Sequence, residues 1–191
     1  MTKKTSHIQS VGGYFHIYNR GVNRQQIFFY DDNYMFFLSR MSVYHTDSGI
    51  DILAYCLMPN HFHLLLRQNE PGAVSQFLGR VCKSYAQAIN KRLNRTGHLF
   101  EGKYKSKVID DTIYLHHLSR YIHRNPVRAK LAIDPLGWKY SSYSFYITQK
   151  SMDVPVNSQP VLQQFKDSRD YRDFVESYTA DDKQKIDKYL F

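Results

Sequence analysis

Two apolar segments separated by a short turn constrain the fold of this chain more than any other feature. Residues 50–57 and 61–67 are rich in Ile, Leu and aromatic side chains, and the sequence Met58-Pro59-Asn60 between them is typical of a turn. Each segment has the length of a strand, and its nearly continuous apolar character indicates burial. The pattern therefore predicts two buried strands joined by a tight connection.

The second segment carries an alternating pair of histidines, His61 and His63. Side chains two positions apart on a strand project from the same face, so the imidazoles lie side by side while Phe62 points into the other layer. Imidazoles held in this way can supply two nitrogens to one divalent metal. The alternative is a pair of hydrogen-bonded core histidines. A histidine-triad nucleotide hydrolase is disfavoured, because Leu65 occupies the third alternating position and the nucleophile of that class is missing.

The composition indicates a basic globular chain that suits a polyanionic partner. Of 191 residues, 42% are hydrophobic, which is enough for one compact domain with a small appendage. Lys and Arg number 26 against 17 Asp and Glu, and the 16 Tyr and 12 Phe add rings that suit nucleic acid. The two cysteines form no CxxC pair, and no apolar run approaches membrane-spanning length. We therefore expect a cytoplasmic protein without a membrane partner.

Hydrophobic periodicity along the whole chain predicts an α+β fold. The expected order is strand, helix, strand, strand, helix, strand and one more helix, which is the split βαβ or ferredoxin-like pattern with an antiparallel sheet. Residues 1–150 are assigned to this domain. Residues 151–191 are predicted to be a small C-terminal helical extension, with a linker at about 153–160 and two short polar helices from about residue 167.

The last helix of the core, from about Thr112, carries a second group of candidate residues. Tyr121 and Asn125 are four positions apart and therefore share one helical face, and Pro126 limits how far the helix continues undistorted. If that face meets the two histidines, the donor set suits Mg²⁺ or Mn²⁺ acting as a Lewis acid. Near a metal and several cations the phenolate of Tyr121 is favoured and can attack phosphorus. The alternative roles are packing for Tyr121 and helix termination for Asn125.

Five short segments between residues 12 and 145 carry a resemblance to a known family. They are residues 18–24, 58–64, 102–106, 121–129 and 138–143. In this order they resemble the single-tyrosine HUH transposases of the small insertion-sequence (IS200-like) type, and more closely the REP-associated tyrosine transposases. The resemblance implies an HUH endonuclease core that cleaves and rejoins single-stranded DNA through a 5′-phosphotyrosine, acting on palindromes that fold into hairpins.

The resemblance also implies roles for individual residues. His61 and His63 correspond to the metal ligands, Tyr121 to the nucleophile and Asn125 to the third ligand, with His123 a secondary candidate. The expected DNA contacts lie in or beside the five segments and are Arg20, Arg24, Lys103, Tyr104, Lys105, Arg124 and Arg128. Such a protein associates with the nucleoid through DNA, as a monomer or a homodimer. The competing hypothesis is a domesticated DNA-binding protein that keeps the fold without catalysis.

Overall fold

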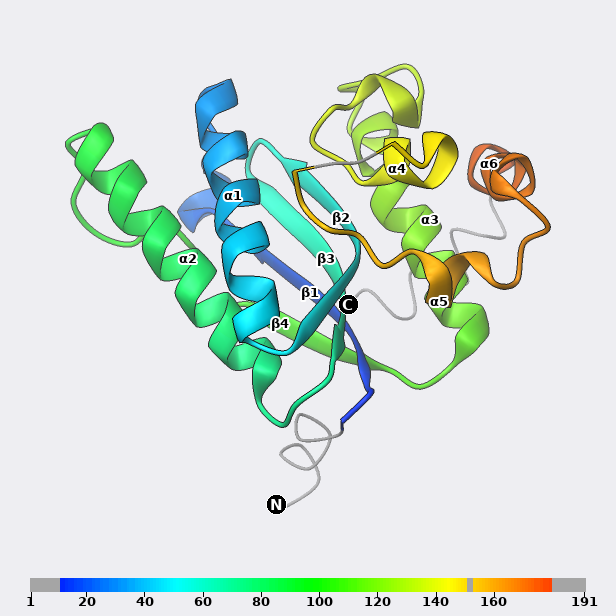
Figure 1. Cartoon of the computed structure of the whole chain (residues 1–191). Coiled ribbons are helices and arrows are strands. Elements are labelled where there is room, and N and C mark those ends of the chain that lie inside the picture. Colours follow the sequence, from blue (N-terminus) through cyan, green and yellow to red (C-terminus); the bar gives the residue numbers. More distant parts are fainter. Residues whose placement is uncertain (1–10, 151–152, 180–191) are drawn as a thin grey trace.

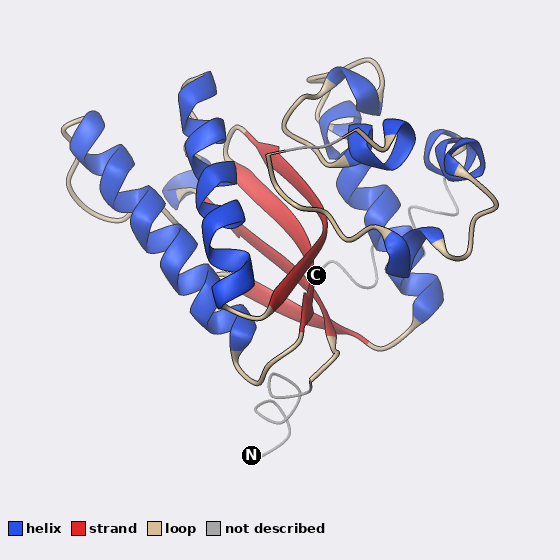
Figure 2. Ribbon diagram, viewed as in Figure 1, coloured by secondary structure: helices blue, strands red, loops and turns tan. Residues whose placement is uncertain are grey.

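A four-stranded sheet forms the centre of the computed structural model, which describes residues 11–150 and 153–179. The strands are β1 (Tyr14–Arg20), β2 (Ile50–Met58), β3 (His61–Gln68) and β4 (Lys105–Ile109). They lie in the order β2-β3-β1-β4, each antiparallel to its neighbours. Helices α1 (Asp31–Asp47) and α2 (Ala73–Arg92) cover one face, and α3 (Thr112–Arg128) covers the other (Figure 1, Figure 2). The predicted α+β, ferredoxin-like core is confirmed.

Alternation along the two central strands divides their side chains between the helical layers. Phe15 and Ile17 of β1 and Phe62 of β3 are fully buried in the core that α1 and α2 complete. His61 and His63 project from the opposite face, where the ring of His63 meets a tyrosine of α3. The two-residue period of the sequence therefore predicted correctly which layer His61, Phe62 and His63 enter.

Helix α3 has clear start and stop signals in its sequence. The Asp111 side chain accepts a hydrogen bond from the backbone N–H of Ile113 at 2.7 Å and so caps the first turn. Leu118 and Ile122 are fully buried on the face that packs against the sheet. The helix continues through Pro126 and ends two residues later. An early end was expected, because proline lacks a backbone N–H and its ring hinders further helical turns.

Three short helices of the C-terminal part surround the outer side of α3. They are α4 (Tyr143–Thr148), α5 (Gln159–Leu162) and α6 (Ser168–Glu176) (Figure 1). Tyr171 of α6 is fully buried, and its hydroxyl lies 2.8 Å from Nδ1 of His123 and 3.0 Å from Oγ of Ser119. The helix that carries Tyr121 is therefore held between the sheet and α6.

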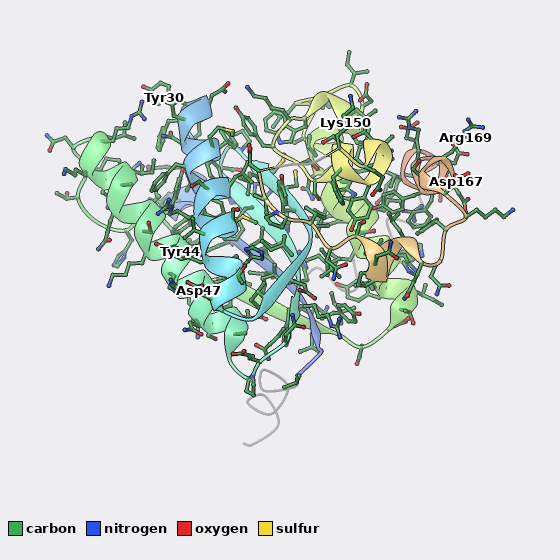
Figure 3. The ribbon with its side chains drawn as sticks, in the orientation of Figure 1. Tyr30, Tyr44, Asp47, Lys150, Asp167 and Arg169 are labelled. Atoms are coloured by element: carbon green, nitrogen blue, oxygen red, sulfur yellow. The ribbon has the colours of Figure 1, made fainter. Side chains whose placement is uncertain are left out.

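The expected C-terminal helices are found in part. Helix α6 begins where the first polar helix was predicted, because the Asp167 carboxylate accepts hydrogen bonds from the backbone N–H groups of Arg169 and Asp170. Asp167 and Arg169 lie at the outer surface (Figure 3). The second polar helix was predicted without bounds, and the chain after residue 179 lies outside the described residues. Within residues 11–150 and 153–179, none of the helices has the length and apolar character needed to span a bilayer.

Candidate metal and DNA site

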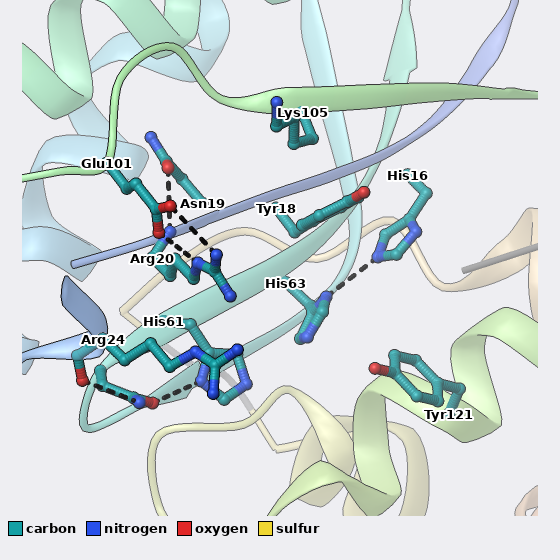
Figure 4. A pocket seen from close by; sticks show the side chains of 11 residues that line it. His16, Tyr18, Asn19, Arg20, Arg24, His61, His63, Glu101, Lys105 and Tyr121 are labelled. Carbon is teal, nitrogen blue, oxygen red and sulfur yellow. Dashed lines mark hydrogen bonds and ion pairs between the residues drawn. The ribbon is translucent and has the colours of Figure 1, made fainter. Parts of the chain in front are cut away.

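A pocket of about 500 Å³ opens where the sheet meets α3. The side chains that line it come from β1, β3, β4, α3 and the loops at this end of the sheet (Figure 4). They are His16, Tyr18, Asn19, Arg20, Arg24, Asn60, His61, His63, Glu101, Lys105 and Tyr121. The pocket thus combines the predicted histidine pair and tyrosine with a basic rim.

His61 and His63 lie next to each other at the start of β3, with ring centroids 5.1 Å apart. Nδ1 of His61 is 2.6 Å from the side-chain oxygen of Asn60. An amide oxygen only accepts, so this nitrogen carries the proton and Nε2 keeps its lone pair. Burial lowers the pKa of both histidines, that of His63 well below its usual value. Both imidazoles are therefore neutral near pH 7, the form that binds metal.

The side chain of Asn125 lies within hydrogen-bonding reach of His61. Its Nδ2 donates a hydrogen bond to the backbone oxygen of Tyr121 at 3.1 Å, one turn earlier in α3. Burial lowers the pKa of His61 and is the largest effect on it. A hydrogen bond with the Asn125 side chain raises this pKa by a smaller amount. The hydrogen bond to Tyr121 holds the Asn125 amide in place beside His61, and its oxygen is the atom that a metal ion there would take as a ligand.

Tyr121 projects from α3 toward the histidines (Figure 4). Its ring meets His63 edge-on at a centroid separation of 5.3 Å, and the residue is 8% exposed. The guanidinium of Arg128, seven residues later on the same helical face, lies 4.8 Å from the centre of the Tyr121 ring. The structure therefore brings together five of the predicted residues: Tyr121, His61, His63, Asn125 and Arg128.

His16 is a site residue that the sequence reasoning missed. It lies on β1, is fully buried, and its Nε2 is 3.0 Å from Nδ1 of His63. Burial, with a smaller contribution from the charge of Lys107, lowers the pKa of His16 to about 3. The alternation of Phe15 and Ile17 into the α1–α2 core could have placed His16 on the other face. The partner of His16 depends on the register between β1 and β3, which the sequence does not reveal.

Three of the predicted cations line the pocket. Arg20 and Arg24 come from the end of β1 and the 3-10 helix that follows it (Val22–Arg24), and Lys105 begins β4. Arg20 also forms a two-point ion pair with Glu101, whose pKa is lowered mainly by that hydrogen bond. About half of each of these two side chains is exposed, so the pair remains accessible to solvent at the pocket rim.

Other predicted residues lie outside the pocket. The Tyr104 hydroxyl is 2.9 Å from Oγ of Ser75 in α2, and the ammonium of Lys103 lies 5.5 Å from the Tyr104 ring. Arg124 donates to the backbone oxygen of Val175 at 3.0 Å at the end of α6, so it faces the C-terminal segment. His123, the secondary metal candidate, is buried on the far side of α3, where Nε2 lies 2.8 Å from Oγ of Ser142.

The donor atoms at the pocket fit an oxygen- and nitrogen-binding divalent ion. Among residues 11–150 and 153–179, no three His, Cys, Asp or Glu side chains converge to form a metal site. The set available near the histidine pair is two imidazole nitrogens and the oxygen of Asn125, with open positions for phosphate and water. Such a set suits Mg²⁺ or Mn²⁺ more than a structural zinc, which takes four protein ligands and commonly includes cysteine.

Comparison with known proteins agrees with this combination of fold and pocket. The sequence model of the IS200-like transposase family matches residues 9–125, and the chain belongs to this family. Its fold is similar to that of a REP-associated tyrosine transposase bound to a REP hairpin, with a TM-score of 0.62 at 18% identity, covering 77% of this chain and 87% of that chain. The family predicted from the five sequence segments is therefore confirmed.

The chain is also similar to a second solved structure. It is a protein from Deinococcus radiodurans described as a transposase, with a TM-score of 0.42 at 18% identity, covering 60% of this chain and 92% of that chain. No curated protein sequence matches the chain.

Proposed function

We propose that this chain is a metal-dependent transposase that cleaves and rejoins single-stranded DNA at hairpin-forming, REP-like palindromes. The observation that carries the proposal is the position of Tyr121, whose hydroxyl is directed at the histidine pair inside a pocket with a basic rim (Figure 4). Membership of the IS200-like transposase family supports a DNA-processing role. All the residues of the proposed site come from one chain, so the site can be complete in cis.

In the proposed reaction the phenolic oxygen of Tyr121 attacks the scissile phosphorus. A Tyr–O–P bond forms and the bond from phosphorus to the 3′ oxygen breaks, so the phosphate stays on the 5′ end of the downstream strand. The leaving 3′ oxygen takes up a proton equivalent to the one that the phenol loses. Rejoining reverses these steps with an incoming 3′-hydroxyl, and the energy of the phosphodiester is conserved in the intermediate.

The side chains around Tyr121 have separate tasks in this proposal. His61, His63 and Asn125 would hold Mg²⁺ or Mn²⁺, and the ion would supply Lewis-acid polarisation of the scissile phosphate. Arg128 lies over the Tyr121 ring, where its charge favours a phenolate and offsets phosphate charge. The sheet and α6 hold α3 from both sides, which fixes the direction of the tyrosine oxygen before the substrate arrives.

The proposed function is tested with a single-stranded oligonucleotide that contains a hairpin flanked by unpaired DNA. Incubation with protein and Mn²⁺ is expected to yield a covalent protein–DNA adduct and a fragment with a free 3′-hydroxyl on a denaturing gel. Both products should disappear when EDTA is added. Tight hairpin binding without any adduct at saturating Mn²⁺ or Mg²⁺ would instead support the non-catalytic DNA-binding alternative.

The basic rim of the pocket is expected to make DNA binding strongly salt-dependent. Replacing Arg24 and Lys105 by Gln should weaken DNA binding. For single strands, the slope of log affinity against log salt concentration should become shallower by about 0.7 for each phosphate that the protein no longer neutralises. Arg169→Gln is the matched control, since this exposed cation lies on α6, away from the pocket lining (Figure 3). An unchanged slope in the double variant, or an equal change in the control, would contradict the assignment of the rim.

A further inference from the structure

His16 contacts the proposed metal ligand His63 from the neighbouring strand. Nε2 of His16 lies 3.0 Å from Nδ1 of His63, and the two rings are stacked with centroids 5.2 Å apart and an interplanar angle of 22°. In the strand register Tyr18 is directly opposite His63, so His16 is its diagonal neighbour on the same sheet face. Both imidazoles are buried between the sheet and α3.

This contact determines which nitrogen of His63 can bind a metal. A neutral imidazole has one donor and one acceptor nitrogen, and one ring of the pair must donate to the other. If Nδ1 of His63 donates to His16, its Nε2 keeps the lone pair and can act as a ligand. If His16 donates instead, the proton of neutral His63 lies on Nε2 and the ligand position is blocked.

The other histidine of the pair has an equivalent support. Nδ1 of His61 is 2.6 Å from the side-chain oxygen of Asn60, which can only accept. Nε2 of His61 is therefore the nitrogen with a lone pair. An acceptor at Nδ1 of His63 produces the same tautomer in both histidines, so that each presents Nε2. Metal-binding histidines usually have such a hydrogen-bond acceptor on the second nitrogen.

The remaining nitrogen of His16 argues against a purely structural role. Nδ1 of His16 is buried and has no hydrogen-bond partner within residues 11–150 and 153–179. When Nε2 accepts from His63, this Nδ1 carries an unsatisfied proton, a cost that the opposite tautomer does not have, so folding alone gives no reason for this arrangement and the role of His63 as a ligand does. An apolar side chain of similar size at position 16 removes this unsatisfied nitrogen but leaves Nδ1 of His63 without its partner, so the number of unsatisfied nitrogens does not rise and the fold does not by itself require histidine here.

We infer that His16 is a positioning residue, which accepts a hydrogen bond from Nδ1 of His63 and thereby holds Nε2 of His63 ready for the metal ion. The inference rests on the proposed function only in taking His63 as a metal ligand. It assigns to β1 a part in the site that the His-x-His pair of β3 does not supply alone. The sequence motif and the supporting histidine are 47 residues apart.

The test uses the full chain with His16→Gln and His16→Leu. Gln places an acceptor near the position of Nε2, whereas Leu keeps most of the volume and removes the acceptor. Mn²⁺ binding without DNA is followed by the electron paramagnetic resonance signal of free Mn²⁺. We expect His16→Gln to bind nearly as tightly as the natural protein and His16→Leu to bind about 10- to 100-fold more weakly, the usual effect of removing such a partner. Thermal unfolding should show no large loss of stability in either variant.

A measurement without metal examines the tautomer directly. In ¹⁵N-histidine spectra of the metal-free protein, His63 is expected to carry its proton on Nδ1, and this preference should be lost in His16→Leu. A proton on Nε2 of His63 in the natural protein would overturn the inference, as would unchanged Mn²⁺ affinity in His16→Leu. If the natural protein binds no Mn²⁺, or the His63→Ala variant binds it equally well, the proposed metal site fails while the spectra still decide the role of His16.

Discussion

Replacing Tyr121 by Phe is expected to abolish the covalent protein–DNA adduct while folding and hairpin binding persist. The substitution removes only the hydroxyl that faces the histidine pair and leaves the ring in place between His63 and Arg128. Loss of a nucleophile typically lowers the rate by on the order of 10⁴-fold or more, so residual cleavage should fall below detection. The measurement is adduct formation on a denaturing gel, with mass spectrometry of the natural protein to locate the modified residue.

Two other tyrosines serve as controls for this prediction. Tyr104 lies outside the pocket with its hydroxyl near Ser75, and Tyr114 is buried in the first turn of α3. Phe at either position should leave the adduct unchanged. Attachment of DNA to Tyr104 or Tyr114, or cleavage retained by Tyr121→Phe, would show that the nucleophile is misassigned.

The parts of the fold that follow from local periodicity were predictable from the sequence. The two-residue alternation in β3 placed His61 and His63 on one face and Phe62 on the other, and the structure has this arrangement. The order of strands and helices was sufficient for the ferredoxin-like topology, because short connections leave few alternatives for a split βαβ chain. Each of these inferences depends on residues close together in the sequence.

Contacts that depend on strand register were not predictable. His16 meets His63 only because β1 lies between β3 and β4 with Tyr18 opposite His63. Lys105, the first residue of β4, and Tyr104 just before it illustrate the same limit. Adjacent side chains on a strand project from opposite faces, and Lys105 lines the pocket while Tyr104 packs toward α2. The basic segment around residue 104 did not indicate which of its side chains would face the site.

The cations of α3 show how a neighbouring element changes the role of a helical face. At about 100° per residue, Arg128 lies within about 20° of Tyr121 around the helix, whereas Arg124 lies about 60° away. The sequence placed both near the site, but the carbonyl groups at the end of α6 accept the guanidinium of Arg124. Arg120 likewise donates to the backbone oxygen of Phe174 at 3.1 Å. The packing of α6 therefore directs these two arginines away from the pocket.

Removing the histidine pair is expected to eliminate metal-dependent cleavage without unfolding the domain. The double variant His61→Ala, His63→Ala loses both imidazole nitrogens of the proposed site and leaves only the oxygen of Asn125, which by itself does not hold a divalent ion. Mn²⁺ affinity and cleavage should both fall by more than about 100-fold, the upper end of the effect of an outer supporting residue. The loss of Mn²⁺ affinity should exceed that in His16→Leu. A missing ligand removes a bond to the ion, whereas a missing acceptor at position 16 only leaves the His63 ring without the hydrogen bond that orients it.

Two further variants separate loss of the ligand from loss of structure. His63→Leu keeps most of the buried volume between the sheet and α3, so its circular dichroism and thermal unfolding should stay close to those of the natural protein while Mn²⁺ binding is lost. His98→Ala changes an exposed histidine outside the pocket lining and should leave both binding and cleavage unchanged. Hairpin binding in EDTA should persist in all variants, because it depends on the basic rim. Full cleavage activity in the double variant would exclude these histidines as metal ligands and would require a different site for the chemistry of this transposase.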